Sequence, residues 1–191
     1  MEAKKYVLKF VVIALTALLV MSCLLPGMIP LKSTPVGPMP VMEKDGDKVI
    51  QVLKGKDWHR LESLAKEKYT EADFAKPGTL TFTVDITDDN PIYFSYGWCT
   101  KTQEILQQNF QHIKIGLYFN GDQLGTDVVQ SLSYNTSDNM YCLDFGVLFS
   151  EWPAGEYKLK AVATFDQKIN DGIADYEAGD YIFDYDVTVK K

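Results

Sequence analysis

Two stretches near the end of the chain show the alternation that most constrains its fold. In residues 157–165 apolar side chains occupy every second position, with mostly polar side chains between them, and residues 181–189 repeat the pattern. Alternation over nine residues is typical of a strand that buries one face in a core and exposes the other to water. The two stretches therefore predict two half-buried β-strands.

The same period of two recurs earlier in the chain, between turn signals such as Asn120-Gly121. It predicts further strands over residues 79–86, 92–99, 113–119, 128–134 and 141–149. With the two closing strands, this spacing indicates a mainly β chain that forms a seven-stranded antiparallel sandwich.

Before residue 79 the apolar residues follow a helical period instead. We expect a helix over residues 57–68 and one further turn at the capping box of residues 70–73. Residues 47–55 are expected to form a short helix, with a strand as the alternative. Another short helix is expected within residues 100–110, between two strands. The sandwich should therefore carry a short helical N-terminal appendage.

The order Gly155-Glu-Tyr157, at the start of the first alternating stretch, carries a resemblance. It resembles the turn into strand F of immunoglobulin-like and fibronectin type III-like sandwiches, where a tyrosine hydroxyl bonds back to the main chain. The resemblance implies an immunoglobulin-like fold, although Leu159 stands where antibody domains place a core cysteine. Domains of this class serve spacing, adhesion, glycan contact and assembly, so the fold leaves the function open.

The first residues resemble the leader of a bacterial lipoprotein. Lys4, Lys5 and Lys9 precede an apolar run, which ends in the lipobox-like sequence Val20-Met-Ser-Cys23. The resemblance implies cleavage before Cys23, acylation of its thiol and a lipid anchor on the extracytoplasmic face of the cell membrane. An uncleaved membrane anchor and a soluble secreted protein are the alternatives. All three export the chain.

These patterns divide the chain into four parts. Residues 1–22 are expected to form a lipoprotein-type signal peptide, and residues 23–42, which are rich in proline, a tether. Residues 43–78 form the short helical segment, and residues 79–191 the immunoglobulin-like β-sandwich.

The chain has three cysteines, and their number agrees with export. If Cys23 takes lipid, Cys99 and Cys142 remain as an even pair, which in an oxidising compartment is expected to form a disulfide. Two unpaired thiols are the alternative.

The connection between the last two strands is long for a hairpin and rich in carboxylates. Within its residues 167–179 and just after them, the oxygen ligands that calcium needs are available from Asp171, Asp175, Glu177 and Asp180. Their spacing does not follow the EF-hand pattern. A calcium site and a solvated acidic loop are therefore both open interpretations.

Three tyrosines, Tyr93, Tyr118 and Tyr176, fall on outward positions or in loops. They could stack on sugars, with Tyr176 as the binding candidate. The alternative is that the N-terminal helices cover the outward face and use these rings as a second small core.

Charge and motif content narrow the function. Beyond residue 22 the chain holds sixteen basic and twenty-five acidic residues, so we expect no nucleic-acid partner. His59 and His112 belong to no catalytic or metal-binding pattern, so we expect no enzyme and no cofactor apart from the calcium option. The sequence favours a non-catalytic, surface-displayed binding or assembly module with a protein or glycan ligand. A carbohydrate-binding or calcium-dependent adhesion domain is the alternative.

Overall fold

The computed structural model describes residues 39–190. The predicted signal peptide, most of the tether, the lipobox-like sequence and Cys23 lie outside the described residues. Within the described part, no helix is both long and apolar enough to cross a membrane.

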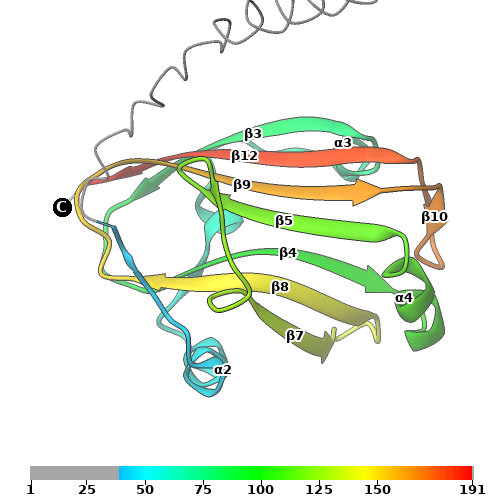
Figure 1. Cartoon of the computed structure of the whole chain (residues 1–191), viewed down its shortest axis with the longest axis horizontal. Helices are drawn as coiled ribbons and strands as arrows, with labels where there is room; N and C mark the ends of the chain where they lie inside the picture. Colours follow the sequence, from blue (N-terminus) through cyan, green and yellow to red (C-terminus); the bar gives the residue numbers. More distant parts are fainter. Residues whose placement is uncertain (1–38, 191) are drawn as a thin grey trace, which may run out of the picture. The chain divides into compact units, whose positions relative to one another are not determined.

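The chain folds as a mainly β sandwich of two facing sheets (Figure 1). The first sheet, here called sheet B, has the strand order β3-β12-β9-β5-β6. Its strands are β3 (Gly78–Ile86), β12 (Gly179–Val189), β9 (Gly155–Phe165), β5 (Ile113–Phe119) and β6 (Asp122–Gln123).

The second sheet, here called sheet A, is centred on β4 (Ile92–Thr100) and β8 (Tyr141–Ser150). Strands β1 (Val41–Met42) and β7 (Gln130–Asn135) pair with β8, and β2 (His59–Arg60) pairs with β4. A separate small hairpin of β10 (Ile169–Asn170) and β11 (Asp175–Tyr176) closes one end of the sandwich.

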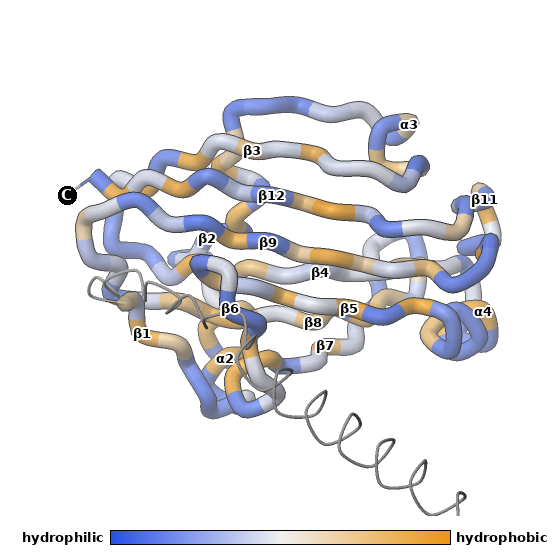
Figure 2. Tube along the Cα trace, turned by 45° about the horizontal axis from the view of Figure 1, so that its top comes forward, coloured by the Kyte–Doolittle hydropathy of each residue, from blue (hydrophilic) through white to orange (hydrophobic). Residues whose placement is uncertain are grey.

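The alternation in the sequence becomes the core between the sheets. Tyr157, Leu159, Ala161, Ala163 and Phe165 of β9 are all buried. Polar residues alternate with them along the strand, which appears as a change between blue and orange in Figure 2. β9 pairs with β12 along its whole length, so the two stretches that alternate most clearly lie side by side in sheet B.

The sheets are mixed rather than purely antiparallel, which corrects the prediction. β3 runs parallel to β12 with Gly78 opposite Tyr181, and β2 runs parallel to β4. Alternation determines which side chains are buried but is the same in either strand direction. The short strands β1, β2, β6, β10 and β11 also join the predicted ones, so the expected count was too simple.

The tyrosine that suggested the immunoglobulin-like resemblance makes the expected contact. Tyr157 donates a hydrogen bond from its hydroxyl to the carbonyl oxygen of Pro153, at 2.9 Å. β9 lies between β12 and β5, which is where strand F lies in an immunoglobulin sandwich. The ring of Trp152, which precedes the turn, packs edge-on against Tyr157.

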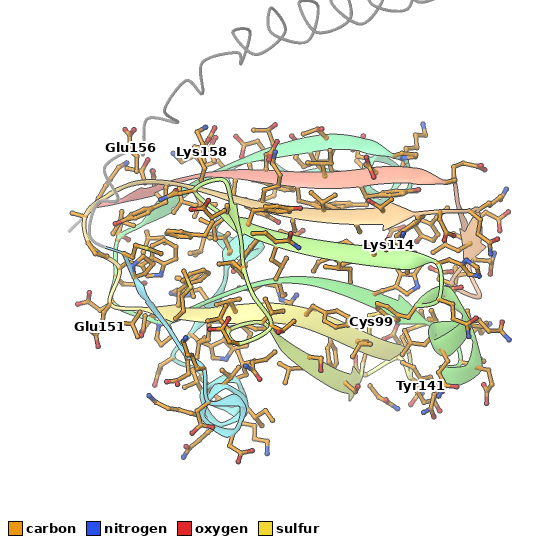
Figure 3. All side chains as sticks on the ribbon, in the orientation of Figure 1. Cys99, Lys114, Tyr141, Glu151, Glu156 and Lys158 are labelled. Atoms are coloured by element: carbon orange, nitrogen blue, oxygen red, sulfur yellow. A yellow bond between two sulfur atoms is a disulfide. The ribbon has the colours of Figure 1, made fainter. Side chains whose placement is uncertain are left out.

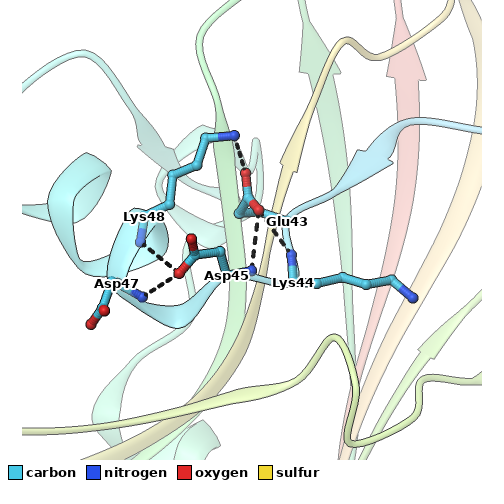
Figure 4. Close-up of polar contacts among 5 residues, drawn as sticks. All are labelled: Glu43, Lys44, Asp45, Asp47 and Lys48. Carbon is cyan, nitrogen blue, oxygen red and sulfur yellow. Dashed lines mark hydrogen bonds and ion pairs between the residues drawn. The ribbon is translucent and has the colours of Figure 1, made fainter.

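The three short α-helices within residues 39–190 begin at residues suited to cap them. α2 (Gly46–Lys54) is capped by Asp45, whose carboxylate accepts from the main-chain N–H groups of Asp47 and Lys48 (Figure 4). α3 (Glu71–Phe74) begins with the capping box predicted for residues 70–73, and α4 (Gln103–Asn109) is capped by Thr102. These side chains satisfy N–H groups that have no partner inside the helix.

The helix expected over residues 57–68 is wrong. The strand β2 and the 3₁₀ turn η2 (Leu61–Leu64) form there instead. Trp58 packs on the outer face of sheet A, whereas Leu61 and Ala65 enter the main core. Because these side chains serve two separate clusters, no single helical face could bury them together.

α2 covers part of the outer face of sheet A (Figure 1). Its Val49 is buried against Tyr93 and Leu148, and Trp58 and Leu132 pack around them. Tyr93 therefore belongs to a second small core beneath the helix.

Candidate functional site

The acidic connection between β9 and β12 does not gather its carboxylates. Among residues 39–190 no group of three or more His, Cys, Asp or Glu side chains is placed to hold a metal ion. Asp171 accepts from the main-chain N–H groups of Ile173 and Ala174 at 2.6 and 2.8 Å, and from the Tyr176 hydroxyl at 3.1 Å. Asp171 thus holds the β10–β11 turn closed.

The other three calcium candidates have partners of their own. Asp175 accepts from Asn170, and Lys168 forms ion pairs with both Asp175 and Glu177 at 3.1 Å. Asp180 accepts from the hydroxyl of Thr164 at 2.6 Å, on the neighbouring strand. These carboxylates therefore form hydrogen bonds and ion pairs within the loop and with β9.

Tyr176 is integrated into the same end of the sandwich. Its ring packs edge-on against Trp98 with 4.8 Å between ring centroids, and its hydroxyl is bound by Asp171. Burial, reinforced by the Asp171 carboxylate, raises the pKa of Tyr176 to about 12. These contacts assign Tyr176 a packing role.

The two cysteines of the predicted pair lie directly opposite one another on β4 and β8, and a disulfide joins Cys99 to Cys142. Figure 3 shows Cys99 at the end of the sandwich near α4. The pair lies on the outer face of sheet A, because the alternate residues of β4, such as Trp98, face the main core.

The two histidines occupy different places. His59 Nε2 lies 3.0 Å from Asp88, and His112 Nδ1 lies 2.9 Å from Asp166 beside the start of β5. Each is a separate surface pair with a carboxylate.

A concave site lies on the outer face of sheet A, where α2 and β7 border a cavity of about 460 Å³. We call it the outer groove. Its walls and floor are formed by Ile50, Leu53, Lys54, Trp58, Arg60, Tyr93, Ser131, Leu132, Ser133, Tyr134 and Asp144. Ile50 and Tyr134 are 38% and 41% exposed, so large apolar surface faces solvent here.

An ion pair with a buried carboxylate forms the floor of the outer groove. Asp144 is 2% exposed, and Arg60 donates to it from Nη2 at 2.8 Å and to Ser95 Oγ from Nη1 at 3.0 Å. Burial opposes the charge on Arg60, but Asp144 outweighs this effect and holds the pKa of the guanidinium above its ordinary value. Tyr134 also donates to Asp144, at 3.4 Å.

The Tyr93 ring completes the floor beneath Arg60. The guanidinium carbon lies 5.7 Å from the ring centroid, within the range of a cation–π contact. The Tyr93 hydroxyl is buried, and no hydrogen-bond partner is found for it in the described chain. Burial raises the pKa of Tyr93 well above its ordinary value, so the ring stays neutral.

Two glycines make room for these side chains. A Cβ at Gly97 would lie 1.7 Å from Asp144 Oδ1, and a Cβ at Gly146 would lie 2.5 Å from the Tyr93 ring. Glycine inside a strand often marks a close approach of this kind. Gly97 and Gly146 are therefore the sequence signal that could have indicated the outer groove. The sequence analysis did not predict this groove or the roles of Arg60, Asp144 and Tyr134 in it.

A second hollow lies on the outer face of sheet B, with a volume of about 560 Å³. Its charged side chains pair across the strands, Lys158 with Asp186 at 2.7 Å and Lys160 with Asp184 at 3.3 Å. Lys158 points away from the core in Figure 3. Because its charges are paired at the surface, we prefer the outer groove as the candidate site.

No protein-family model matches the chain, and no curated protein matches it. Similar solved structures include PbICP-C in complex with falcipain-2, with 9% identity and a TM-score of 0.36 over 71% of this chain and 100% of that chain. The cysteine protease inhibitor EhICP2 from Entamoeba histolytica has 10% identity and a TM-score of 0.30 over the same shares. Amebosin has 13% identity and a TM-score of 0.23 over 59% of this chain and 96% of that chain. Likeness at these TM-scores carries no argument about what this chain binds.

Proposed function

We propose that this chain is a non-catalytic binding module, displayed on the outside of a bacterial cell by a lipid on Cys23, and that its outer groove holds the ligand. The observation that carries the proposal is the groove itself. Exposed apolar side chains lie there beside an ion pair whose carboxylate, Asp144, is buried. The lipobox-like sequence and the proline-rich tether supply the display.

The composition of the outer groove fits recognition by packing and orientation. Tyr134, Trp58 and Ile50 offer apolar area that a ligand would cover. Two donor atoms of Arg60 are bound by Asp144 and Ser95, and its side chain remains 37% exposed. Since a guanidinium has five N–H donors, Arg60 can still orient a ligand that carries an acceptor oxygen.

A protein segment is the ligand we favour, with a pull-down from intact envelopes as the test. The full chain is compared with Ile50→Ser/Tyr134→Ser, and with Tyr118→Ser on the outer face of sheet B as the matched control. We expect the captured protein to be lost with the double variant and retained with the control. Equal capture by both variants would exclude the outer groove as the site.

A glycan ligand is the second candidate, because the exposed Tyr134 ring lies beside the Arg60–Asp144 pair. Aromatic rings and charged planar groups together suit stacking on, and hydrogen bonding to, a sugar. A glycan array with the full chain should then give a signal that Tyr134→Ala removes and Tyr176→Ala retains. The absence of any signal would leave the protein segment as the ligand.

A further inference from the structure

β7 is an edge strand without the protection that such strands normally carry. Within residues 39–190, β8 is its only partner strand. Its sequence, Gln-Ser-Leu-Ser-Tyr-Asn, contains no charge and no proline, and its register with β8 runs one-to-one from Gln130 to Asn135 without a bulge. Charges, prolines, bulges and covering segments are the usual means of blocking edge-to-edge pairing.

The edges of sheet B show these protections. Residues 65–69 cover β3: the main-chain N–H of Lys66 donates to the carbonyl oxygen of Thr83, and Glu67 binds the N–H and hydroxyl of the same residue. The β5 edge is partly covered by β6 and carries Lys114, which is exposed. Within residues 39–190, the β7 edge has no such covering segment paired along it and carries no charged side chain.

The hydrogen bonding beyond β7 indicates which of its main-chain groups are free. Thr136 donates its N–H to the carbonyl oxygen of Met140, which continues the β7–β8 register by one residue. In an antiparallel ladder, alternate residues bond to the partner strand. Leu132 and Tyr134 share the parity of Thr136 and face β8, so the main-chain groups of Ser131 and Ser133 point to the open edge.

We propose that β7 pairs antiparallel with β7 of a second copy, about a two-fold axis beside Leu132, and joins two A sheets into one. In this register Ser131 lies opposite Ser133 of the second copy, and the two residues can exchange both main-chain hydrogen bonds. Leu132 then lies opposite its own counterpart, and Gln130 opposite Tyr134. Serine meets serine and leucine meets leucine, with no charge opposed to a like charge.

The pattern of β7 favours a second copy over an unrelated strand. Cross-strand hydroxyl pairs and apolar pairs each stabilise a sheet, and a two-fold axis generates both from one sequence. It also places Tyr134 of each copy at the rim of the other copy's outer groove. Because the body of the chain is acidic, we expect the two copies to repel at long range, so salt should strengthen the dimer.

The test is disulfide cross-linking of the full chain in detergent, with the wild type as the blank for its own cysteines. Leu132→Cys lies on the axis and should give at least tenfold more cross-linked dimer than the wild type. Gln130→Cys alone and Tyr134→Cys alone should each give no more cross-linked dimer than the wild type. A mixture of the two variants should give cross-linked dimer above that level. A blank-level yield from Leu132→Cys, or efficient cross-linking of Tyr134→Cys alone, would overturn the proposal.

A second measurement guards against misfolded variants. Ser131→Lys/Ser133→Lys puts four lysines across the proposed interface but changes only exposed positions, so its melting temperature should match that of the wild type. In sedimentation, we expect its dimer fraction to fall at least fivefold and the wild-type fraction to rise with salt. An unchanged dimer fraction would contradict pairing through β7, whatever ligand the outer groove binds.

Discussion

Asp144 shows what the outer groove demands of individual residues. It is a carboxylate with 2% exposure on the outer face of sheet A, and Arg60 is its ion-pair partner. A buried ion pair often contributes little net stability, whereas removal of one partner is costly. The Asp144 carboxylate fits beside β4 because residue 97 is glycine, and a Cβ at that position would lie 1.7 Å from Asp144 Oδ1.

The glycine gives the first prediction. In Gly97→Ala, the new Cβ would meet Asp144 Oδ1 at 1.7 Å and force the carboxylate away from Arg60. We expect the free energy of unfolding to fall by about 2 kcal/mol, the usual cost of overpacking. In an Asp144→Ala background the same change should cost much less. Guanidinium denaturation of the four proteins measures the coupling, and additive costs would show that no clash occurs.

Tyr157 gives the second prediction at the residue scale. Its hydroxyl donates to the carbonyl oxygen of Pro153, and its ring is buried beneath the turn. Tyr157→Phe keeps the ring and removes the hydroxyl that makes this hydrogen bond, so we expect a loss of about 1 kcal/mol in the free energy of unfolding. Tyr118→Phe, on the outer face of sheet B, is the matched control. Equal losses from both changes would argue against a special role for the corner.

At the scale of elements, the sequence predicts strands better than it predicts their direction. β9 and β12 follow from alternation because in each strand every second side chain is buried in, or packs against, one core. The parallel course of β3 does not follow, since alternation is the same in both directions. The helix expected over residues 57–68 fails for a different reason: Trp58 and Leu61 pack in different clusters, which only the tertiary structure reveals.

The cover over β3 gives the third prediction. Glu67 accepts from the N–H of Thr83 at 2.6 Å and from its hydroxyl at 2.8 Å, and these bonds hold the pKa of the Glu67 carboxyl below its ordinary value of 4.5. A lowered folded-state pKa means that the stabilisation is present above pH 4.5 and is lost as the pH falls through the folded pKa.

Urea denaturation between about pH 6 and pH 3, a range that spans the ordinary glutamate pKa, measures this effect. We expect the wild type to be more stable than Glu67→Gln at the upper end and the difference to shrink as the solution is acidified. Glu62→Gln, which removes an exposed carboxyl nearby, is the control. Parallel pH profiles for the wild type and Glu67→Gln would mean that this carboxylate does not hold the edge.

At the scale of the whole molecule, the candidate site could not be read from the sequence as one unit. The loop of residues 167–179 is continuous in the sequence, so its carboxylates could be recognised together as a candidate site. In the structure these carboxylates form hydrogen bonds and ion pairs within the loop. The outer groove combines α2, Arg60, β7 and Asp144, which are distant in sequence. Only the pairing of β4 with β8, and of β7 with β8, brings them together.

Export, as proposed for the whole chain, would link the lipobox-like sequence to the Cys99–Cys142 disulfide. The fourth prediction counts free thiols with a maleimide of high mass, added after denaturation without reductant. A lipid-anchored chain with the disulfide should take up no label, because all three of its cysteines are blocked. A variant lacking residues 1–22 stays in the reducing cytoplasm and should take up three labels.

One label on the full chain would indicate an intact disulfide beside an unmodified Cys23, as in an uncleaved anchor or a secreted form. Two labels would show that Cys99 and Cys142 remain thiols, and would overturn the link between this fold and an oxidising compartment.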